Sequence, residues 1–331
     1  MENSHVAAAP SRGSLRWAIL RRAINMPPPS SLDDHSVDVV NKDISRKRSC
    51  GFKLIPCCNF IVDPAGECQS ENTRRSGPIE ISVCYKLPIA GDPKLVMIQR
   101  SENSVDLDDF RFSNSHDIDT TGLVCCWPSE DVLAYICINL CEVFRSKRVL
   151  ELGSGYGLAG LAVAICTEAL EVVISDGNPQ VVDYLQRSIN MNSNAFGDTK
   201  VRSMELHWNQ EHKHELLNYF DIIIASDCTF FKEFQGCLAQ TIKSLLKNSE
   251  TSEAIFLSPK RGDSLSRFLT KIKDLGLFYE LFENYDSKVW NLHQKFLHGD
   301  DASWPNYDAD HCYPLLVRIT LQESKISNTE N

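Results

Sequence analysis

The chain has 331 residues, of which 43% are hydrophobic and 24% are charged. These values exclude wholesale disorder and allow about two domains, or one domain with appendages. Asp and Glu outnumber Lys and Arg by 44 to 34, and the formal charge of -10 argues against a nucleic-acid partner, because such binders usually present a basic face. No apolar run approaches the roughly 18 residues of a membrane span, so we expect no membrane partner.

The 13 cysteines bear on the compartment and on metal binding. They form no Cys-x-x-Cys pair, and several lie in apolar stretches, as buried free thiols usually do. We therefore expect a monomer in a reducing compartment, the cytoplasm and nucleus. An Arg-rich transit peptide is the alternative for the N-terminus, weakened by Glu2 and by the lack of a Ser-rich run. His207, His212 and His214 cluster without the cysteine or acid that would complete a ligand set, so we expect no metal.

The first 120 residues predict two segments of different character. Residues 14–24 favour a short helix, which a Pro-rich and polar linker follows. Farther along, Ile79 to Tyr85 alternates apolar and polar residues, and a second extended run follows a Gly-Asp-Pro turn. We therefore predict an N-terminal helix and linker over 1–50 and a small antiparallel β extension over 51–120.

From residue 121 to 322 strand-like and helical runs alternate. Ile222-Ile223-Ile224 is apolar on both faces, as a parallel sheet covered by helices requires. The expected strands are 148–151, 171–175, 201–206, 221–225, 253–257, 277–282 and 313–321, and the expected helices are 128–145, 157–167, 179–193, 233–247 and 263–275. This alternation predicts an α/β domain with a doubly wound sheet, followed by a polar tail over 323–331. Ligands of such sheets bind beyond the carboxyl ends of the strands.

A glycine-rich turn follows the first of these strands. Glu151 ends the strand, and Gly153, Gly155 and Gly157 follow within six residues. Closely spaced glycines let the backbone turn sharply and approach a ligand, although a plain strand-to-helix turn is the alternative. Leu158 stands where a nicotinamide-binding turn needs Gly or Ala, which disfavours a pyrophosphate ligand.

The next three strands also end in polar or aromatic side chains. Asp176 could accept both hydroxyls of a ribose, and Trp208 could stack on a purine. Asp227, with Phe230 three residues on, lies where a reacting group would be held. Each of the first three has a structural alternative, which is a turn-forming Asp, a core indole and a helix N-cap, respectively.

Taken together, these motifs resemble the seven-strand (class I, Rossmann-like) methyltransferases that use S-adenosylmethionine, in the branch that methylates protein lysines. The resemblance rests on Trp127, the Glu-Leu-Gly-Ser-Gly-x-Gly-Leu-x-Gly run from Glu151 to Gly160, Asp176, the Leu-x-Trp at 206–208, and the Asp-x-x-Phe at 227–230. It implies a strand order of 3-2-1-4-5-7-6, with the last strand antiparallel.

The resemblance also implies a site for S-adenosylmethionine at these strand ends. Trp127 and Gly153 would line the methionine part, Asp176 would hold the ribose and Trp208 would contact the adenine. The implied cofactor-binding set is Trp127, Glu151, Gly153, Gly155, Asp176, Trp208 and Asp227.

The resemblance makes Asp227 and Phe230 the catalytic pair, facing the methyl group and the incoming lysine. Family members often have Tyr in place of Phe230, so the apolar wall is kept here without a hydroxyl. A bare carboxylate raises the pKa of a nearby lysine, and we therefore assign Asp227 to orienting the ammonium or the cofactor rather than to accepting the proton.

Several less common runs resemble the members of this branch that methylate calmodulin. They are 126–135, 175–178, 259–262, 283–286 and 313–316. The resemblance implies calmodulin as the protein partner; another protein substrate, or a non-catalytic binding module on the same fold, is the alternative. Because calmodulin and this chain are both acidic, we expect local cations to aid encounter, at Lys260-Arg261 with Arg267 or at Lys271 with Lys273. The aromatic insert from 284 to 310 is either an interface or a satellite core.

Overall fold

The computed structural model of the protein describes residues 51–60, 80–100, 121–124 and 127–322. The helix predicted over 14–24 and the tail over 323–331 lie outside these ranges, as do the linker and part of the β extension. No helix within the described ranges is long and apolar enough to cross a membrane.

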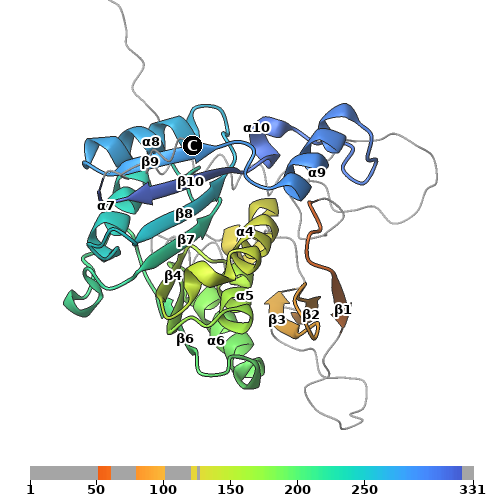
Figure 1. Ribbon diagram of the computed structural model, residues 1–331, viewed down its shortest axis with the longest axis horizontal. Helices are drawn as coiled ribbons and strands as arrows, with labels where there is room; N and C mark the ends of the chain where they lie inside the picture. The colour runs from red at the N-terminus through yellow and green to blue at the C-terminus, as the bar shows by residue number, and fades with distance from the viewer. Residues whose placement is uncertain (1–50, 61–79, 101–120, 125–126, 323–331) are drawn as a thin grey trace, which may run out of the picture. The chain divides into compact units, whose positions relative to one another are not determined.

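A seven-stranded sheet forms the centre of the protein (Figure 1). Its order is β6-β5-β4-β7-β8-β10-β9, which is the predicted 3-2-1-4-5-7-6. The strands are β4 (Arg148–Leu152), β5 (Glu171–Asp176), β6 (Lys200–Glu205), β7 (Ile222–Ser226), β8 (Glu253–Ser258), β9 (Phe278–Phe282) and β10 (Leu315–Thr320). β10 runs antiparallel to both of its neighbours, and the pairs from β6 to β8 are parallel. The predicted fold class is confirmed.

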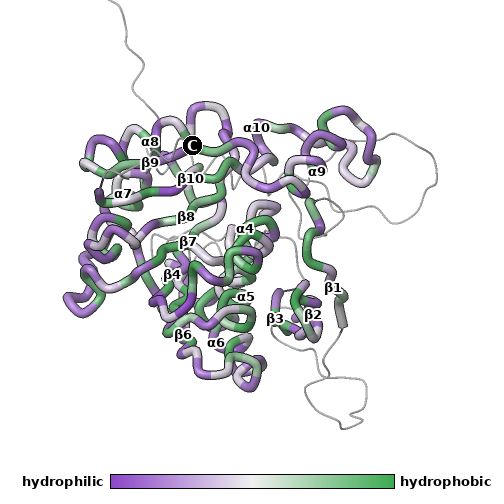
Figure 2. The backbone as a smooth tube through the Cα atoms, viewed as in Figure 1, coloured by the Kyte–Doolittle hydropathy of each residue, from purple (hydrophilic) through white to green (hydrophobic). Residues whose placement is uncertain are grey.

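Helices cover both faces of this sheet (Figure 1). On one side lie α4 (Pro128–Asn139), α5 (Leu158–Cys166) and α6 (Pro179–Met191), and on the other α7 (Gln235–Leu245) and α8 (Ser264–Asp274). α4 and α5 are hydrophobic along most of their length (Figure 2), because they pack against each other as well as against the sheet. α6 begins where Asn178 accepts a hydrogen bond from the backbone N–H of Gln180 and Pro179 takes the first helical position.

The β extension packs against α6. β1 (Cys57–Phe60), β2 (Glu80–Lys86) and β3 (Lys94–Arg100) form a three-stranded antiparallel sheet, as predicted. Asn192 joins it to the end of α6: its Oδ1 accepts from Val96 N at 2.9 Å, and its Nδ2 donates to Val96 O at 2.6 Å. Ser188 accepts from Ile98 N at 3.0 Å in the same way. The side chains of α6 thus replace a further strand at the edge of β3.

The aromatic insert packs as a core, as one of its two predicted alternatives holds, but this core is continuous with the main one and not a separate satellite. It contains α9 (Ser287–His298) and α10 (Ala309–Cys312). Phe52 from the β extension packs edge-on against Phe296 and Trp304, with ring centroids 5.8 and 5.7 Å away. All three side chains are buried, so the aromatic residues here hold the extension against the insert.

Candidate functional site

An open cavity lies at the carboxyl ends of β4, β5 and β7. Its empty volume, including the mouth, is about 930 Å³, within the range of small-molecule sites. Seven of the predicted site residues line it: Trp127, Gly153, Gly155, Asp176, Trp208, Asp227 and Phe230. Glu151 is the one predicted site residue that does not. Residues from 127 to 230 therefore meet at one edge of the sheet, as the sequence predicts.

The glycine turn forms the floor of the cavity. Gly153, Gly155 and Gly157 have φ values of 58°, 54° and 75°, in the left-handed region that favours glycine. A Cβ at Gly153 would lie 2.8 Å from Cys228 Sγ and 3.1 Å from Trp208 Cζ2. Trp208 is half-buried against the core and also lines the cavity, so its indole packs as a core residue and is still placed where a purine could meet it.

We expect Gly153→Ala to weaken cofactor binding far more than Gly155→Ala. Both substitutions strain a left-handed backbone, at a cost of about 1–3 kcal/mol. Only the first also drives a methyl group into Cys228 and Trp208, since the contacts of a Cβ at Gly155 begin at 3.7 Å. Calorimetric titration with S-adenosylmethionine measures both variants. Equal losses of affinity would show that backbone strain alone is responsible.

Asp176 connects the glycine turn to the start of α6. Its Oδ2 accepts from Gly155 N at 3.0 Å, and its Oδ1 accepts from Asn178 N at 2.9 Å. A carboxylate offers about four lone-pair positions, so these bonds leave it able to accept ribose hydroxyls as well. The turn-forming and ribose-binding interpretations of Asp176 are therefore compatible.

Glu151 lies beneath the cavity and not in its wall. Its side chain is buried, and its Oε2 accepts from the backbone N–H of Gly160 at 2.9 Å. Burial raises the pKa of this carboxyl well above its usual value, and the nearby Glu130 and Asp176 raise it further. The structure thus places Glu151 where it supports the start of α5, and its predicted role toward the cofactor stays a prediction.

We expect the Glu151→Gln variant to be more stable than the wild type, by a margin that grows as the pH rises. Its affinity for S-adenosylmethionine should be nearly unchanged. Because the folded-state pKa of Glu151 is raised, its contribution to stability is complete below its unfolded pKa, about 4.3, and is lost as the pH rises from there. Glutamine does not titrate and can still accept from Gly160. Thermal unfolding across this pH range measures the widening difference. A clear loss of S-adenosylmethionine affinity would instead restore Glu151 as a cofactor ligand.

Asp227 follows β7 in a left-handed conformation, with a φ of 54°. Its carboxylate is buried and accepts from Ser129 Oγ at 3.0 Å. Arg261 binds it through two bonds of 2.9 Å, from Nε to Oδ1 and from Nη2 to Oδ2. Burial raises the pKa of the Asp227 carboxyl, while Arg261 and Ser129 oppose that rise. The Asp227 carboxylate, which was expected to be unpaired, is therefore an ion-paired group.

Arg261 does not belong to a surface cluster with Lys260 and Arg267, and that expectation is wrong. Only 13% of its side chain is exposed, and its guanidinium lies over the ring of Trp127, 4.8 Å from the centroid. Arg267 is itself paired with Asp263 on the surface. Arg261 is therefore part of the site and does not steer a distant partner.

Aromatic side chains line one end of the cavity. The rings of Trp127 and Phe230 lie 5.3 Å apart, and Phe230 and Phe231 are 3.8 Å apart between centroids. Phe234 also lines the cavity. This end can hold the hydrocarbon stem of a long side chain against flat apolar faces, with Asp227 beside it.

The described residues fit an adenosyl sulfonium at this place. The glycine turn lets the backbone approach the ligand, Asp176 can accept from a ribose, and the indole of Trp208 can cover a purine. No group of three or more described His, Cys, Asp or Glu side chains could hold a metal ion. The predicted role of each residue toward the cofactor stays a prediction.

Comparisons with known proteins agree with this site. The sequence model of a lysine methyltransferase family matches residues 120–275. The chain is 58% identical to the calmodulin-lysine N-methyltransferase of Arabidopsis thaliana, over 94% of this chain and 98% of that protein. It is 28% identical to the mouse protein-lysine N-methyltransferase EEF2KMT, over 57% and 59% of the two chains. It is 27% identical to the protein N-lysine methyltransferase METTL21A of Danio rerio, over 59% and 87%. Because the 58% identity to the Arabidopsis lysine methyltransferase extends over almost the whole of both chains, and because the fold and the cavity agree with it, the chain belongs to the lysine methyltransferase family.

Proposed function

We propose that the protein transfers methyl groups from S-adenosylmethionine to the side-chain amine of a lysine in calmodulin. The observation that carries the choice of substrate is the similarity to the Arabidopsis calmodulin-lysine N-methyltransferase, which extends from the methyltransferase domain into the β extension and the aromatic insert. We further propose that the protein acts as a monomer in the cytoplasm and nucleus, with no nucleic-acid or membrane partner. The acidic charge supports the absence of a nucleic-acid partner, and the cysteine pattern supports a reducing compartment.

The bound cofactor supplies an electrophilic methyl group, which the lysine nitrogen attacks as the carbon–sulfur bond breaks. The chain must therefore place an amine in line with that bond and exclude water from it. Trp127 and Phe230 can orient the lysine stem, since their rings form the wall next to Asp227. Phe230 has no hydroxyl, so apolar contact and the polar groups beside it must fix the amine.

The test is incubation of the purified protein with labelled S-adenosylmethionine, calmodulin and, in parallel, a cell lysate. We expect label in calmodulin, and mass spectrometry should place it on a lysine side chain. Calmodulin whose modified lysine is changed to arginine is the matched control. Label in another protein of the lysate with none in calmodulin would identify a different substrate. Binding of the cofactor by calorimetry without any transfer would indicate a non-catalytic module.

A further inference from the structure

Asp227 and Arg261 form an ion pair that is almost enclosed, with 2% and 13% of their side chains exposed. Both carboxylate oxygens of Asp227 accept from the guanidinium, and Oδ2 also accepts from Ser129 Oγ. A bidentate pair of this kind is among the stronger charged contacts in proteins. The charge of Asp227 is therefore balanced within the protein before a substrate binds.

The guanidinium lies directly behind the aromatic end of the cavity. It is 4.8 Å from the ring centroid of Trp127 and 5.5 Å from that of Phe230, and both rings line the cavity together with Asp227. An amine that reaches this wall therefore meets a carboxylate whose charge the guanidinium behind it already balances. That balance affects the amine strongly because little water separates the groups.

The backbone holds Arg261 in place. Its N–H donates to Asp310 O at 2.8 Å, and the N–H of Gly262 donates to Asp310 Oδ2 at 2.7 Å. Its φ of 46° is left-handed, a conformation that a non-glycine residue keeps only where its surroundings impose it. Removing one partner of a buried pair is strongly destabilising, so we do not expect an incoming lysine to displace the guanidinium.

Building on the methyl transfer proposed above, we propose that Arg261 is a positioning residue of that reaction: it balances the charge of Asp227, so that no uncompensated carboxylate keeps the acceptor lysine as its ammonium and the lysine can bind as its neutral amine. Only the neutral amine has the lone pair that forms the new nitrogen–carbon bond. The electron pair of the broken carbon–sulfur bond stays on sulfur, and the methylated ammonium then loses its extra proton to water.

The difficulty that this arrangement addresses is the basicity of lysine. With a pKa of about 10.4, only about 1 lysine in 2,500 is neutral at pH 7. An unpaired carboxylate at Asp227 would favour the ammonium form of the lysine further. When Asp227 is paired with Arg261, that effect is cancelled, and burial of the lysine then favours its neutral form. The net charge of the Asp227–Arg261 pair therefore shifts the pH at which the bound amine loses its proton.

Other titratable or charged groups face the pair from each neighbouring element. They are Glu130 on α4, Asp176 on β5, Cys228 after β7, and Asp310 and Cys312 on α10. Burial raises the pKa of the Cys228 and Cys312 thiols, so both stay neutral near pH 7. All of these groups are present in every variant below, and the differences between variants come from the pair.

Three variants change the charge of the pair at a pH where Asp227 is ionised: Arg261→Gln then leaves -1, Asp227→Asn leaves +1, and the double variant leaves 0, as in the wild type. We measure kcat for calmodulin methylation against pH, because kcat reports groups in the bound complex. For Arg261→Gln, the rising limb of the profile should move to higher pH by about 1–2 units. For Asp227→Asn it should move to lower pH, and for the double variant it should return close to the wild-type position even where kcat itself is reduced.

The matched control is Arg145→Gln, which breaks an exposed ion pair with Glu142 and should leave the profile in place. Profiles that superimpose for the wild type and Arg261→Gln would overturn the proposal, since a merely structural loss lowers kcat without moving its pH dependence. Absence of calmodulin methylation by the wild type would instead count against the proposed function. Thermal unfolding tests the ion pair independently of activity. The double variant should lose less stability than the two single variants together, and additive losses would contradict the proposal that Asp227 and Arg261 act as one pair.

Discussion

Replacement of Asp227 by alanine should slow methyl transfer by at least about 100-fold, while affinity for S-adenosylmethionine changes much less. The substitution removes the partner of the Arg261 guanidinium and of the Ser129 hydroxyl at once. The buried cation is then uncompensated behind Trp127 and Phe230, so the wall that orients the lysine loses its support. The expected ribose and adenine contacts at Asp176 and Trp208 remain. Single-turnover kinetics and calorimetric titration separate the two effects.

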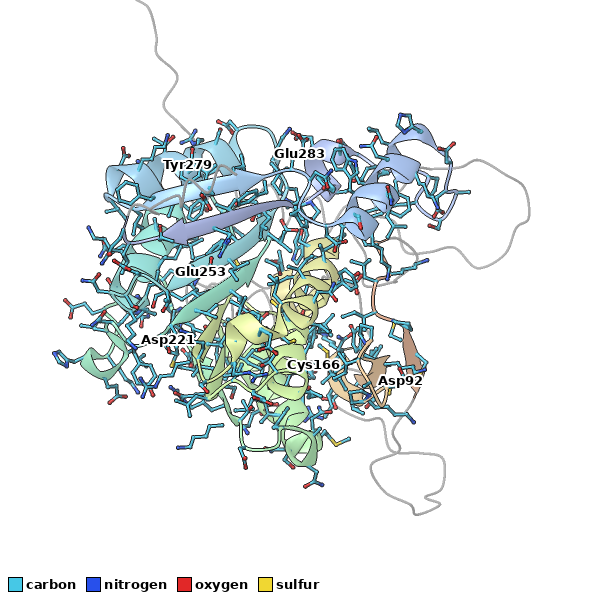
Figure 3. The ribbon with its side chains drawn as sticks, viewed as in Figure 1. Asp92, Cys166, Asp221, Glu253, Tyr279 and Glu283 are labelled. Atoms are coloured by element: carbon cyan, nitrogen blue, oxygen red, sulfur yellow. The ribbon has the colours of Figure 1, made fainter. Side chains whose placement is uncertain are left out.

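The matched control for this variant is Asp221→Ala, at the opposite end of β7 (Figure 3). Asp221 is also buried, and its carboxylate accepts from Arg148 N and from Lys247 Nζ. Its loss should lower the unfolding temperature but leave the turnover of folded molecules near the wild-type value. Unchanged turnover in Asp227→Ala, or equal losses in both variants, would contradict the role of Asp227 in the site.

The sheet and the cavity edge could be predicted from the sequence because both depend on local patterns. Ile222-Ile223-Ile224 is apolar on both faces, and the structure buries all three in the parallel strand β7. Asp176 ends β5, Trp208 lies three residues past β6, and Asp227 directly follows β7, and the carboxyl ends of these parallel strands meet at one edge. Position after a strand was therefore enough to bring Asp176, Trp208 and Asp227 together.

The contacts of Arg261 could not be predicted in the same way. Arg261 and Asp227 are 34 positions apart in different loops, and their pairing depends on a left-handed backbone at both residues. In the sequence Arg261 stands among Lys260 and Arg267, which favours a surface cluster. Ser129 gives no signal beyond its place in a helix start, although its hydroxyl is buried against Asp227. Burial and pairing of charged side chains are tertiary properties, which composition does not reveal.

The direction of the Glu151 side chain could not be predicted either, because it too depends on tertiary packing. A strand-end residue can point into the cavity or beneath it, and the period-two pattern does not distinguish the two when both faces are buried. The aromatic insert likewise has a composition that suits an interface or a satellite core. Only the packing of Phe52, from more than two hundred residues earlier, shows that it is a core.

The second large effect is expected at the other end of the cavity, where Asp176→Ala should weaken S-adenosylmethionine binding by roughly 100-fold. Hydrogen bonds to a charged group contribute about 1.5–3 kcal/mol, and two ribose hydroxyls bonded to one carboxylate account for a loss of this size. The variant also leaves the N–H groups of Gly155 and Asn178 without this acceptor, so the glycine turn should loosen. Calorimetric titration gives the affinity, and thermal unfolding gives the cost to the fold.

Asp176→Asn and Asp183→Ala separate these two contributions. Asparagine keeps the shape and one carbonyl acceptor, and should recover part of the stability but little of the affinity, because it lacks the charge that strengthens both ribose bonds. Asp183 is an exposed acid on α6 with 69% of its side chain accessible, so its removal tests whether overall negative charge matters. If Asp183→Ala weakened binding as much as Asp176→Ala, the field of the acidic protein would explain the affinity. If only the Asp176 variants do so, the carboxylate at the end of β5 is the group that holds the cofactor, since its charge acts from a fixed position at the cavity wall.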